Sequence, residues 1–150
     1  MQNIKKMVIV LDTNVFVSAL LGSGGSSRII FRRCLEGHYQ PLMGNALFSE
    51  YESLLNRSDI FKTCALNAGE REEIFDAFLS VCRWVTIYFG WRPNLKDEGD
   101  NHLIELAVAG GAEYVITKNT KDFHGAELIF SAFKVIRPEQ FIDEVKPWLP

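Results

Sequence analysis

The sequence has few cysteines and no CxxC pair. Cys34, Cys64 and Cys82 form an odd, widely spaced set, which argues against a disulfide framework and a cysteine-based zinc site. Such cysteines are typical of buried thiols in a reducing cytoplasm. The sequence also lacks an apolar run long enough to span a membrane. The run that begins at Met7 ends at Asp12, too early for a signal peptide, so we expect a cytoplasmic protein with no membrane partner.

An excess of positive charge is also absent. The chain has 16 Lys and Arg against 19 Asp and Glu, a formal net charge of -3, which excludes a generic basic coat for nucleic acid. This balance does not exclude a nuclease, because clustered carboxylates that hold metal lower the net charge while local basic rims bind phosphate. With 150 residues, 47% of them hydrophobic, the chain is expected to form one domain over residues 1–150.

Short apolar runs alternate along the chain with segments of helical periodicity. The runs predict strands at 7–11, 39–43, 84–87, 114–117 and 133–136. The periodic segments predict helices at 15–21, 28–35, 47–55, 70–82, 101–109 and 138–145. This alternation predicts the α/β class, as a three-layer α/β/α sandwich with a central parallel sheet of about five strands.

The apolar run from Met7 to Leu11 is typical of a central strand, and it stops at Asp12. In an open α/β sheet the carboxyl ends of the central strands border the crevice where ligands bind. A carboxylate at this point therefore indicates a site. Asp12 or Thr13 can equally serve as a cap for the helix that follows, and this stretch alone leaves both readings open.

Two further acids occupy comparable places. Glu50 lies early in the helix after the second strand, and Asp100 begins the helix before the fourth strand. Strand carboxyl ends and helix amino ends meet at one edge of such a sheet, so these acids are expected to converge with Asp12, with Asp97 and Asp122 beside them. Each acid also has an ordinary alternative as a cap, an exposed helix residue or a solvated loop residue. Clustered carboxylates suit Mg²⁺ or Mn²⁺ better than zinc.

Four segments resemble, in order, the signatures of the PIN domain family. They are Leu11-Asp12-Thr13-Asn14-Val15, Leu47-Phe48-Ser49-Glu50, Asp97-Glu98-Gly99-Asp100-Asn101 with 103–107, and Val115-Ile116-Thr117. The longer stretches 12–21 and 50–57 are similar to a group of toxin components of toxin–antitoxin pairs, relatives of VapC-type toxins. One motif alone is weak, but four in order over nearly the whole chain are specific.

The resemblance implies a Mg²⁺- or Mn²⁺-dependent endoribonuclease that cleaves RNA, together with an antitoxin protein and a homodimer as partners. It implies Asp12, Glu50 and Asp100 as catalytic acids, which would hold the metal with help from Asp97. Thr13 and Asn14 would then orient these ligands. We give His38, His102 and His124 no role, because lone histidines are more often surface residues than ligands.

One departure from the family pattern concerns the fourth acid. Many members carry Thr-Gly-Asp-x-Asp after the fourth strand, whereas this chain has Asn119 at the acidic position and Asp122 slightly later. Both residues are therefore expected at the border of the pocket, and the weakened second metal site keeps a non-enzymatic RNA- or protein-binding scaffold as the alternative. An aspartyl-phosphate phosphatase of the haloacid dehalogenase type is disfavoured, because it needs a second Asp where Asn14 stands.

RNA binding requires cations near the acidic pocket. The candidates are Arg28, Arg32, Arg33, Arg57, Lys118 and Lys121. Any one of them can equally be ordinary solvated surface. The aromatic residues in or near loops, Phe61, Trp84, Trp91 and Trp148, form either a dimer interface or the edge of the core.

Overall fold

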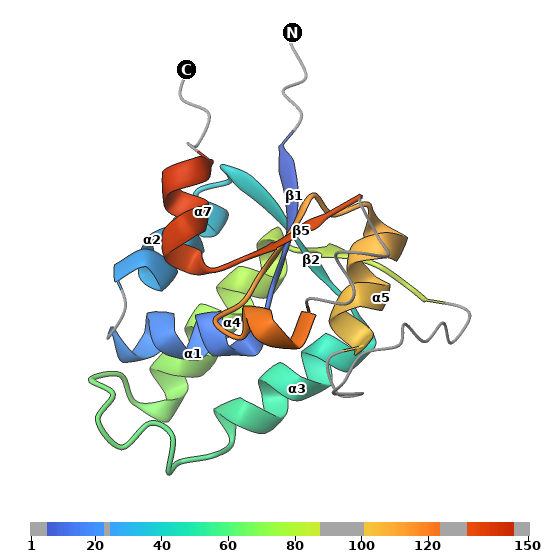
Figure 1. The fold of residues 1–150 in the computed structure, drawn as a ribbon. Helices are drawn as coiled ribbons and strands as arrows, with labels where there is room; N and C mark the ends of the chain where they lie inside the picture. The colour runs from blue at the N-terminus through green and yellow to red at the C-terminus, as the bar shows by residue number, and fades with distance from the viewer. Residues whose placement is uncertain (1–5, 23–24, 88–100, 124–131, 146–150) are drawn as a thin grey trace, which may run out of the picture.

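The computed structural model describes residues 6–22, 25–87, 101–123 and 132–145 (Figure 1). A parallel sheet runs through the middle of the molecule in the order β3-β2-β1-β4-β5. Its strands are β1 (Met7–Leu11), β2 (Tyr39–Met43), β3 (Arg83–Trp84), β4 (Tyr114–Ile116) and β5 (Lys134–Ile136). The predicted parallel sheet of five strands is confirmed.

Helices connect the strands, as the periodicity predicted. They are α1 (Thr13–Leu21), α2 (Gly25–Leu35), α3 (Asn45–Leu55), α4 (Ala68–Val81), α5 (Asn101–Gly110) and α7 (Pro138–Glu144), with a short 3₁₀ helix η2 (Thr120–Phe123). α1 begins two residues earlier than expected because Asp12 caps it directly. It ends at Gly22, whose φ of 71° is a left-handed conformation that glycine adopts without steric cost.

β1 is the central strand, and its last three residues are buried. It pairs with β2 on one side and with β4 on the other, where Leu11 is in register with Ile116. From β1 the chain builds β2 and β3 on one side, then crosses to build β4 and β5 on the other. The connections therefore diverge at the carboxyl ends of β1 and β4, the point where open α/β sheets bind ligands.

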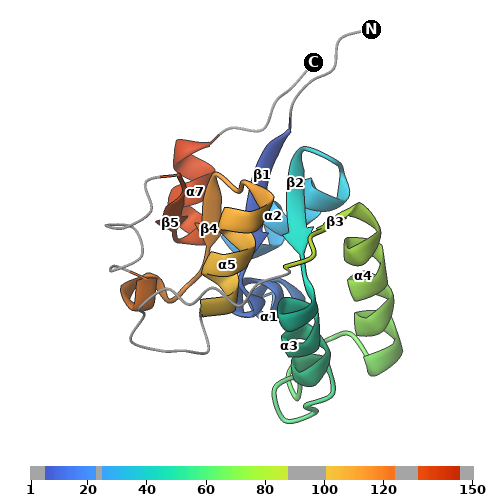
Figure 2. The ribbon, with the colours of Figure 1, turned by 90° about the vertical axis from the view of Figure 1, so that its right-hand side faces the viewer.

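Helices cover both faces of the sheet. Figure 2 shows α5 in front of the strands and α2 behind them. α5 packs against β1, β2 and β4, whereas α2 packs against β2 and contacts α1, α4 and α7. On the α2 side the core is aromatic, and the ring of Phe16 lies 5.3 Å from Phe31, 5.1 Å from Tyr51 and 5.8 Å from Phe75 between centroids. This cluster holds four helices against the sheet edge that carries Asp12.

The third strand is shorter than the sequence pattern predicted. β3 covers only Arg83–Trp84, because β2 ends at Met43 and turns into α3, which leaves the later residues without a partner strand. The last bond of this pairing is donated by the Val85 N–H to the Met43 carbonyl, at 2.8 Å. Thr86 and Ile87 are exposed.

The loop between α3 and α4 is fixed by Arg71. Its guanidinium lies 4.4 Å from the ring centroid of Phe61, and Nη1 donates to the Leu66 carbonyl at 2.7 Å. Phe61 is therefore buried, which contradicts an exposed interface role for this residue. Trp84 is 49% exposed, while Trp91 and Trp148 lie outside the described residues.

Candidate acidic site at the carboxyl edge of the sheet

Asp12 lies where β1 ends and α1 begins, and its two carboxylate oxygens serve different purposes. Oδ1 accepts a hydrogen bond from the Thr13 N–H at 2.7 Å, which caps α1. Oδ2 accepts from the Thr117 hydroxyl at 2.8 Å. Only 6% of Asp12 is exposed. The two readings of Asp12 from the sequence, cap and site, are therefore compatible.

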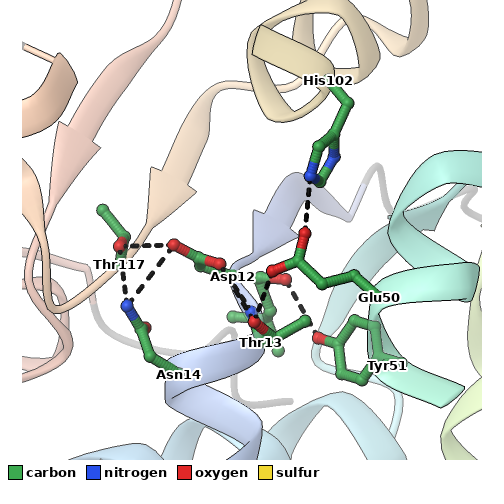
Figure 3. Close-up of polar contacts among 8 residues, drawn as sticks. Asp12, Thr13, Asn14, Glu50, Tyr51, His102 and Thr117 are labelled. Atoms are coloured by element: carbon green, nitrogen blue, oxygen red, sulfur yellow. Dashed lines mark hydrogen bonds and ion pairs between the residues drawn. The ribbon is translucent and has the colours of Figure 1, made fainter. Parts of the chain in front are cut away.

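Thr117 and Asn14 hold the Asp12 carboxylate from the β4 side (Figure 3). The Thr117 hydroxyl donates to Asp12 and accepts from Asn14 Nδ2 at 3.2 Å and from the Asn119 N–H at 3.0 Å. A hydroxyl has one donor and two lone pairs, so this group is saturated. Asn14 also reaches Asp12 Oδ2 at 3.4 Å and accepts from the Lys118 N–H. This network leaves the carboxylate little freedom to rotate.

Glu50 projects from α3 toward the same point. Its Oε1 lies 2.9 Å from the Thr13 hydroxyl, and that hydroxyl is also 3.4 Å from Asp12 Oδ1. Thr13 thus stands between the two acids, and its single proton favours the shorter contact with Glu50. The structure therefore brings two of the three expected catalytic acids together, through a threonine that the sequence placed beside them.

The two carboxyl groups differ electrostatically. Burial raises the pKa of Asp12, and the nearby charge of Glu50 raises it further, against the lowering effect of the Thr117 hydrogen bond. Glu50 behaves in the opposite way, because the hydrogen bond with His102 lowers its pKa despite partial burial. Of the two, Asp12 is therefore the acid whose negative charge the protein stabilises less, and a cation at this point would stabilise it.

His102, in the first turn of α5, is part of the site although the sequence analysis gave it no role. Its Nε2 lies 2.7 Å from Glu50 Oε2. Because an ionised carboxylate only accepts hydrogen bonds, Nε2 carries the proton of this contact. Nδ1 is buried without a hydrogen-bond partner in the part of the chain that the structure describes. Figure 3 shows the imidazole directed at Glu50 from α5.

A topological signal in the sequence points to His102 and Thr117. Helix amino ends and strand carboxyl ends meet at this edge, which places polar side chains of every type there as well as acids. Among these polar side chains are His102 at the start of α5 and Thr117 directly after β4. Residue type alone does not distinguish them from surface polar residues.

The donor set fits an oxygen-preferring divalent cation. Asp12 and Glu50 present carboxylate oxygens on either side of the Thr13 hydroxyl, the chemistry that Mg²⁺ and Mn²⁺ favour. No three Asp, Glu, His or Cys side chains within the described ranges form a group that could hold an ion. Asp97 and Asp100, the other expected ligands, lie outside those ranges.

Asn119 and Asp122 bind each other. The Asn119 side-chain amide donates to the Asp122 carboxylate, and the Asp122 N–H donates to the Asn119 carbonyl at 3.3 Å. Within the described residues, Asn119 meets the acid network through its backbone N–H alone, which donates to the Thr117 hydroxyl. The pair therefore lies one residue beyond the Asp12 network and shapes the turn into η2.

The expected RNA-binding cations are dispersed. Lys118 Nζ lies 2.9 Å from the Ser18 hydroxyl, and Lys118 lines a cleft of about 430 Å³ together with Thr13 and Glu50. The others lie elsewhere. Arg28 and Arg32 line a separate cavity of about 540 Å³ beside the end of α1. Arg33 contacts the Tyr39 hydroxyl, and Arg57 pairs with Asp59. Lys121 lies exposed in η2. Only Lys118 borders the acid pair among these six.

A parallel α/β sandwich with an acid pair at its topological switch point is the class of protein that this fold and site define. The sequence model described as PIN domain matches residues 8–121. The chain therefore belongs to the PIN domain family.

The fold has a counterpart among solved structures. A chain in the crystal structure of VapBC2 from Rickettsia felis, bound to a DNA fragment from their promoter, superposes with a TM-score of 0.54 at 15% sequence identity. The match covers 87% of this chain and 98% of that chain, and at this identity it is a likeness of fold. No curated protein sequence matches the chain. None of the helices within the described residues is long and apolar enough to cross a membrane.

Proposed function

We propose that this protein is a Mg²⁺- or Mn²⁺-dependent endoribonuclease that acts in the cytoplasm as the toxin of a toxin–antitoxin pair. The observation that supports it most is the pairing of Asp12 and Glu50 across the Thr13 hydroxyl at the carboxyl edge of a PIN domain. Asp12 is buried there with a raised pKa. A buried carboxylate next to a second acid is expected where a cation is bound.

Each residue of the site has a specific task in this proposal. Asp12 and Glu50 would hold the cation, and the sequence motif adds Asp97 and Asp100 as further ligands. When bound, such ions activate a water molecule and stabilise the leaving oxygen of a phosphodiester. Thr117 and Asn14 fix the direction of the Asp12 carboxylate. Thr13 keeps the two acids in one arrangement before the cation arrives.

RNA cleavage in the presence and absence of Mn²⁺ tests the proposal. The wild type should cleave a mixed RNA substrate with Mn²⁺ and not with chelator. Asp12→Asn should lower cleavage by more than about 100-fold and weaken Mn²⁺ binding in calorimetry, because it removes a charged ligand. Asp59→Asn is the matched control, since Asp59 is an exposed acid that pairs only with Arg57 within the described residues.

The alternative, a non-enzymatic scaffold, predicts no RNA cleavage and no effect of Asp12→Asn. A scaffold would bind RNA or protein, release no fragments with any divalent cation, and behave identically with Asp12 and with Asn at that position. The contact between Asn119 and Asp122 favours this alternative, because it engages the Asp122 carboxylate and so removes one potential acidic ligand from the pocket.

We also propose two protein partners, an antitoxin and a second copy of the chain. The matched fold occurs in a VapBC2 structure, and Trp84 leaves a large apolar side chain exposed at the β3 edge of the sheet. Light scattering over a range of concentrations should give the mass of two chains, and Trp84→Glu should shift it toward one. A constant mass of one chain would exclude the dimer.

A further inference from the structure

The cleft beside the acid pair follows one face of α1. Thr13, Val17 and Leu21 are spaced four residues apart along this helix and all line the cleft. Residues at this spacing lie on the same helix face, so α1 forms the floor. From Thr13 to Leu21 the floor extends about 12 Å at 1.5 Å per residue. It begins at the acid pair and leads away from it.

As far as the structure describes the chain, the walls of the cleft are mostly apolar and include one cation. Leu54 and Ile60 contribute aliphatic side chains, and Lys118 contributes an ammonium group that is 2.9 Å from the Ser18 hydroxyl. Leu54 lies one helical turn after Glu50 on α3. The apolar part of the cleft is therefore continuous with the acid pair on both α1 and α3.

This combination of surfaces matches one chemical class of ligand. A cleft that is acidic at one end, apolar along its length and bordered by a lysine fits a molecule with an anionic group next to a flat apolar one. A nucleotide within an RNA strand has this form, since its base has an apolar face and its phosphates are anionic. An apolar peptide would pack on the aliphatic walls but would make no use of the ammonium group of Lys118.

We propose that this cleft is a nucleoside-binding subsite, which holds the base of the nucleotide next to the scissile phosphate. The base packs on Val17 and Leu54, and the ammonium group of Lys118 binds a neighbouring phosphate. This inference rests on the proposed ribonuclease function. It adds the path that the RNA strand takes across the protein.

Among the described residues, the cleft lining includes no aromatic side chain. Its polar side chains already have partners in the protein: Thr13 bonds to Glu50, Asn14 to Thr117 and Ser18 to Lys118. The subsite therefore detects the presence of a base without distinguishing one base from another.

Abasic substitution tests the subsite without altering the protein. The probe is a short fluorescein-labelled single-stranded RNA, and each nucleotide is replaced in turn by an abasic one. Anisotropy in chelator gives its affinity, and the products formed with Mn²⁺ give the cleavage position. One nucleotide that flanks the cleavage position should be sensitive, with affinity about 10-fold lower when its base is missing, because the apolar face of the base is then no longer buried on Val17 and Leu54. Exchanging that base for another should change affinity less than threefold.

A pair of adjacent leucines tests the location of the subsite. Leu54→Ser should weaken binding of the intact RNA several-fold and leave the affinity for the sensitive abasic RNA unchanged. Leu55→Ser is the matched control, because Leu55 is also partly buried but lines a different hollow between α3 and α4. It should leave the affinity for both RNAs unchanged. Melting temperatures of both variants establish that each is folded.

Two results would overturn the subsite. The first is equal affinity of the wild type for the intact RNA and for every abasic RNA. The second is an equal effect of Leu54→Ser and Leu55→Ser on binding. Either result combined with normal Mn²⁺-dependent cleavage rejects the subsite and keeps the ribonuclease. Loss of cleavage in every condition, with Asp12→Asn indistinguishable from wild type, rejects the ribonuclease itself.

Discussion

Asp12 and Glu50 occupy one pocket but respond to it in opposite directions. Burial raises the pKa of Asp12, whereas the hydrogen bond with His102 lowers the pKa of Glu50. A raised pKa means that the folded protein holds the proton more tightly than the unfolded chain does. The stability that Asp12 contributes is then present below its unfolded pKa and lost as pH rises through the folded pKa. The stability that Glu50 contributes is present above its pKa in the unfolded chain and is lost as pH falls through its lower pKa in the folded protein.

These directions predict the pH dependence of two variants without metal. In chelator at neutral pH, Asp12→Asn should melt a few degrees above wild type, since Asn removes a poorly solvated charge and can still accept the Thr13 N–H. The difference should vanish in acid. Glu50→Gln should melt below wild type at neutral pH, and this difference should also vanish in acid. Calorimetric scans across pH measure both, and a lower melting temperature for Asp12→Asn at neutral pH would contradict the prediction.

His102 is expected to position Glu50. Its Nε2 contact at 2.7 Å fixes the carboxylate, and partners of this kind typically change metal affinity 10- to 100-fold when removed. His102→Leu should therefore weaken Mn²⁺ binding and RNA cleavage by about 10-fold. His102→Gln, which retains a donor, should recover most of both. The matched control is His38→Leu, because His38 lies 3.8 Å from Glu36 and away from the pocket. Unchanged Mn²⁺ affinity in His102→Leu would remove this role.

At the scale of elements, the loop from 56 to 67 depends on one side chain of α4. Arg71 donates to the Leu66 carbonyl and lies over Phe61, and Ile60 of the same loop lines the cleft. Arg71→Met keeps the apolar volume but removes the donor and the cation–π contact. We expect a loss of about 1–3 kcal/mol in urea unfolding, with faster hydrogen exchange of the loop amides.

Arg57→Met is the control for this loop, because Arg57 forms an exposed pair with Asp59. Such pairs contribute about 0–1 kcal/mol. Equal losses in the two variants would show that Arg71 does not anchor the loop.

The elements that the sequence predicted well are those that one local pattern specifies. β1 was correct at both ends, because a continuous apolar run stops at an acid. The third strand is predicted at 84–87 but observed at Arg83–Trp84, because its extent depends on where β2 ends, and no local pattern carries that information. α4 begins at Ala68 rather than at residue 70, through the reciprocal bonds of Asn67 and Glu70. This capping box, with Asn at the cap and Glu three residues later, is a signal that the sequence itself carries for the earlier start.

The sequence predicts where the acids lie in the fold, but it does not predict which side chains they contact. The position of Asp12 after β1 and of Glu50 early in α3 follows from topology. That Thr13 stands between them follows from side-chain rotamers and helix orientation, which the sequence does not specify. Arg28, Arg32 and Arg33 fall within one predicted helix, yet the structure separates Arg33 from the other two.

At the scale of the whole molecule, the net charge of -3 predicts a weak dependence of RNA binding on salt. Lys118 is the one cation among the described residues that line the cleft. For single strands, log K falls with log salt by about 0.7 per phosphate contact. One such contact gives an expected slope of roughly -0.7, measured by anisotropy in chelator.

Lys118→Gln should reduce this slope toward zero, whereas Lys121→Gln, in the neighbouring 3₁₀ helix, should leave it unchanged. A steep slope that persists in Lys118→Gln would place the phosphate contacts elsewhere, for example at the cavity lined by Arg28 and Arg32.

During synthesis, β1 emerges from the ribosome long before β4. The Asp12 N–H bonds to the Ile116 carbonyl, and its carboxylate bonds to Thr117, which is 105 residues later. At 5–20 residues per second, translation takes roughly 5–20 s to cover that distance. Throughout this interval the central strand lacks one neighbour and Asp12 lacks the hydroxyl that orients it. A protein partner made at the same time therefore has several seconds to meet the growing chain before its acidic site exists.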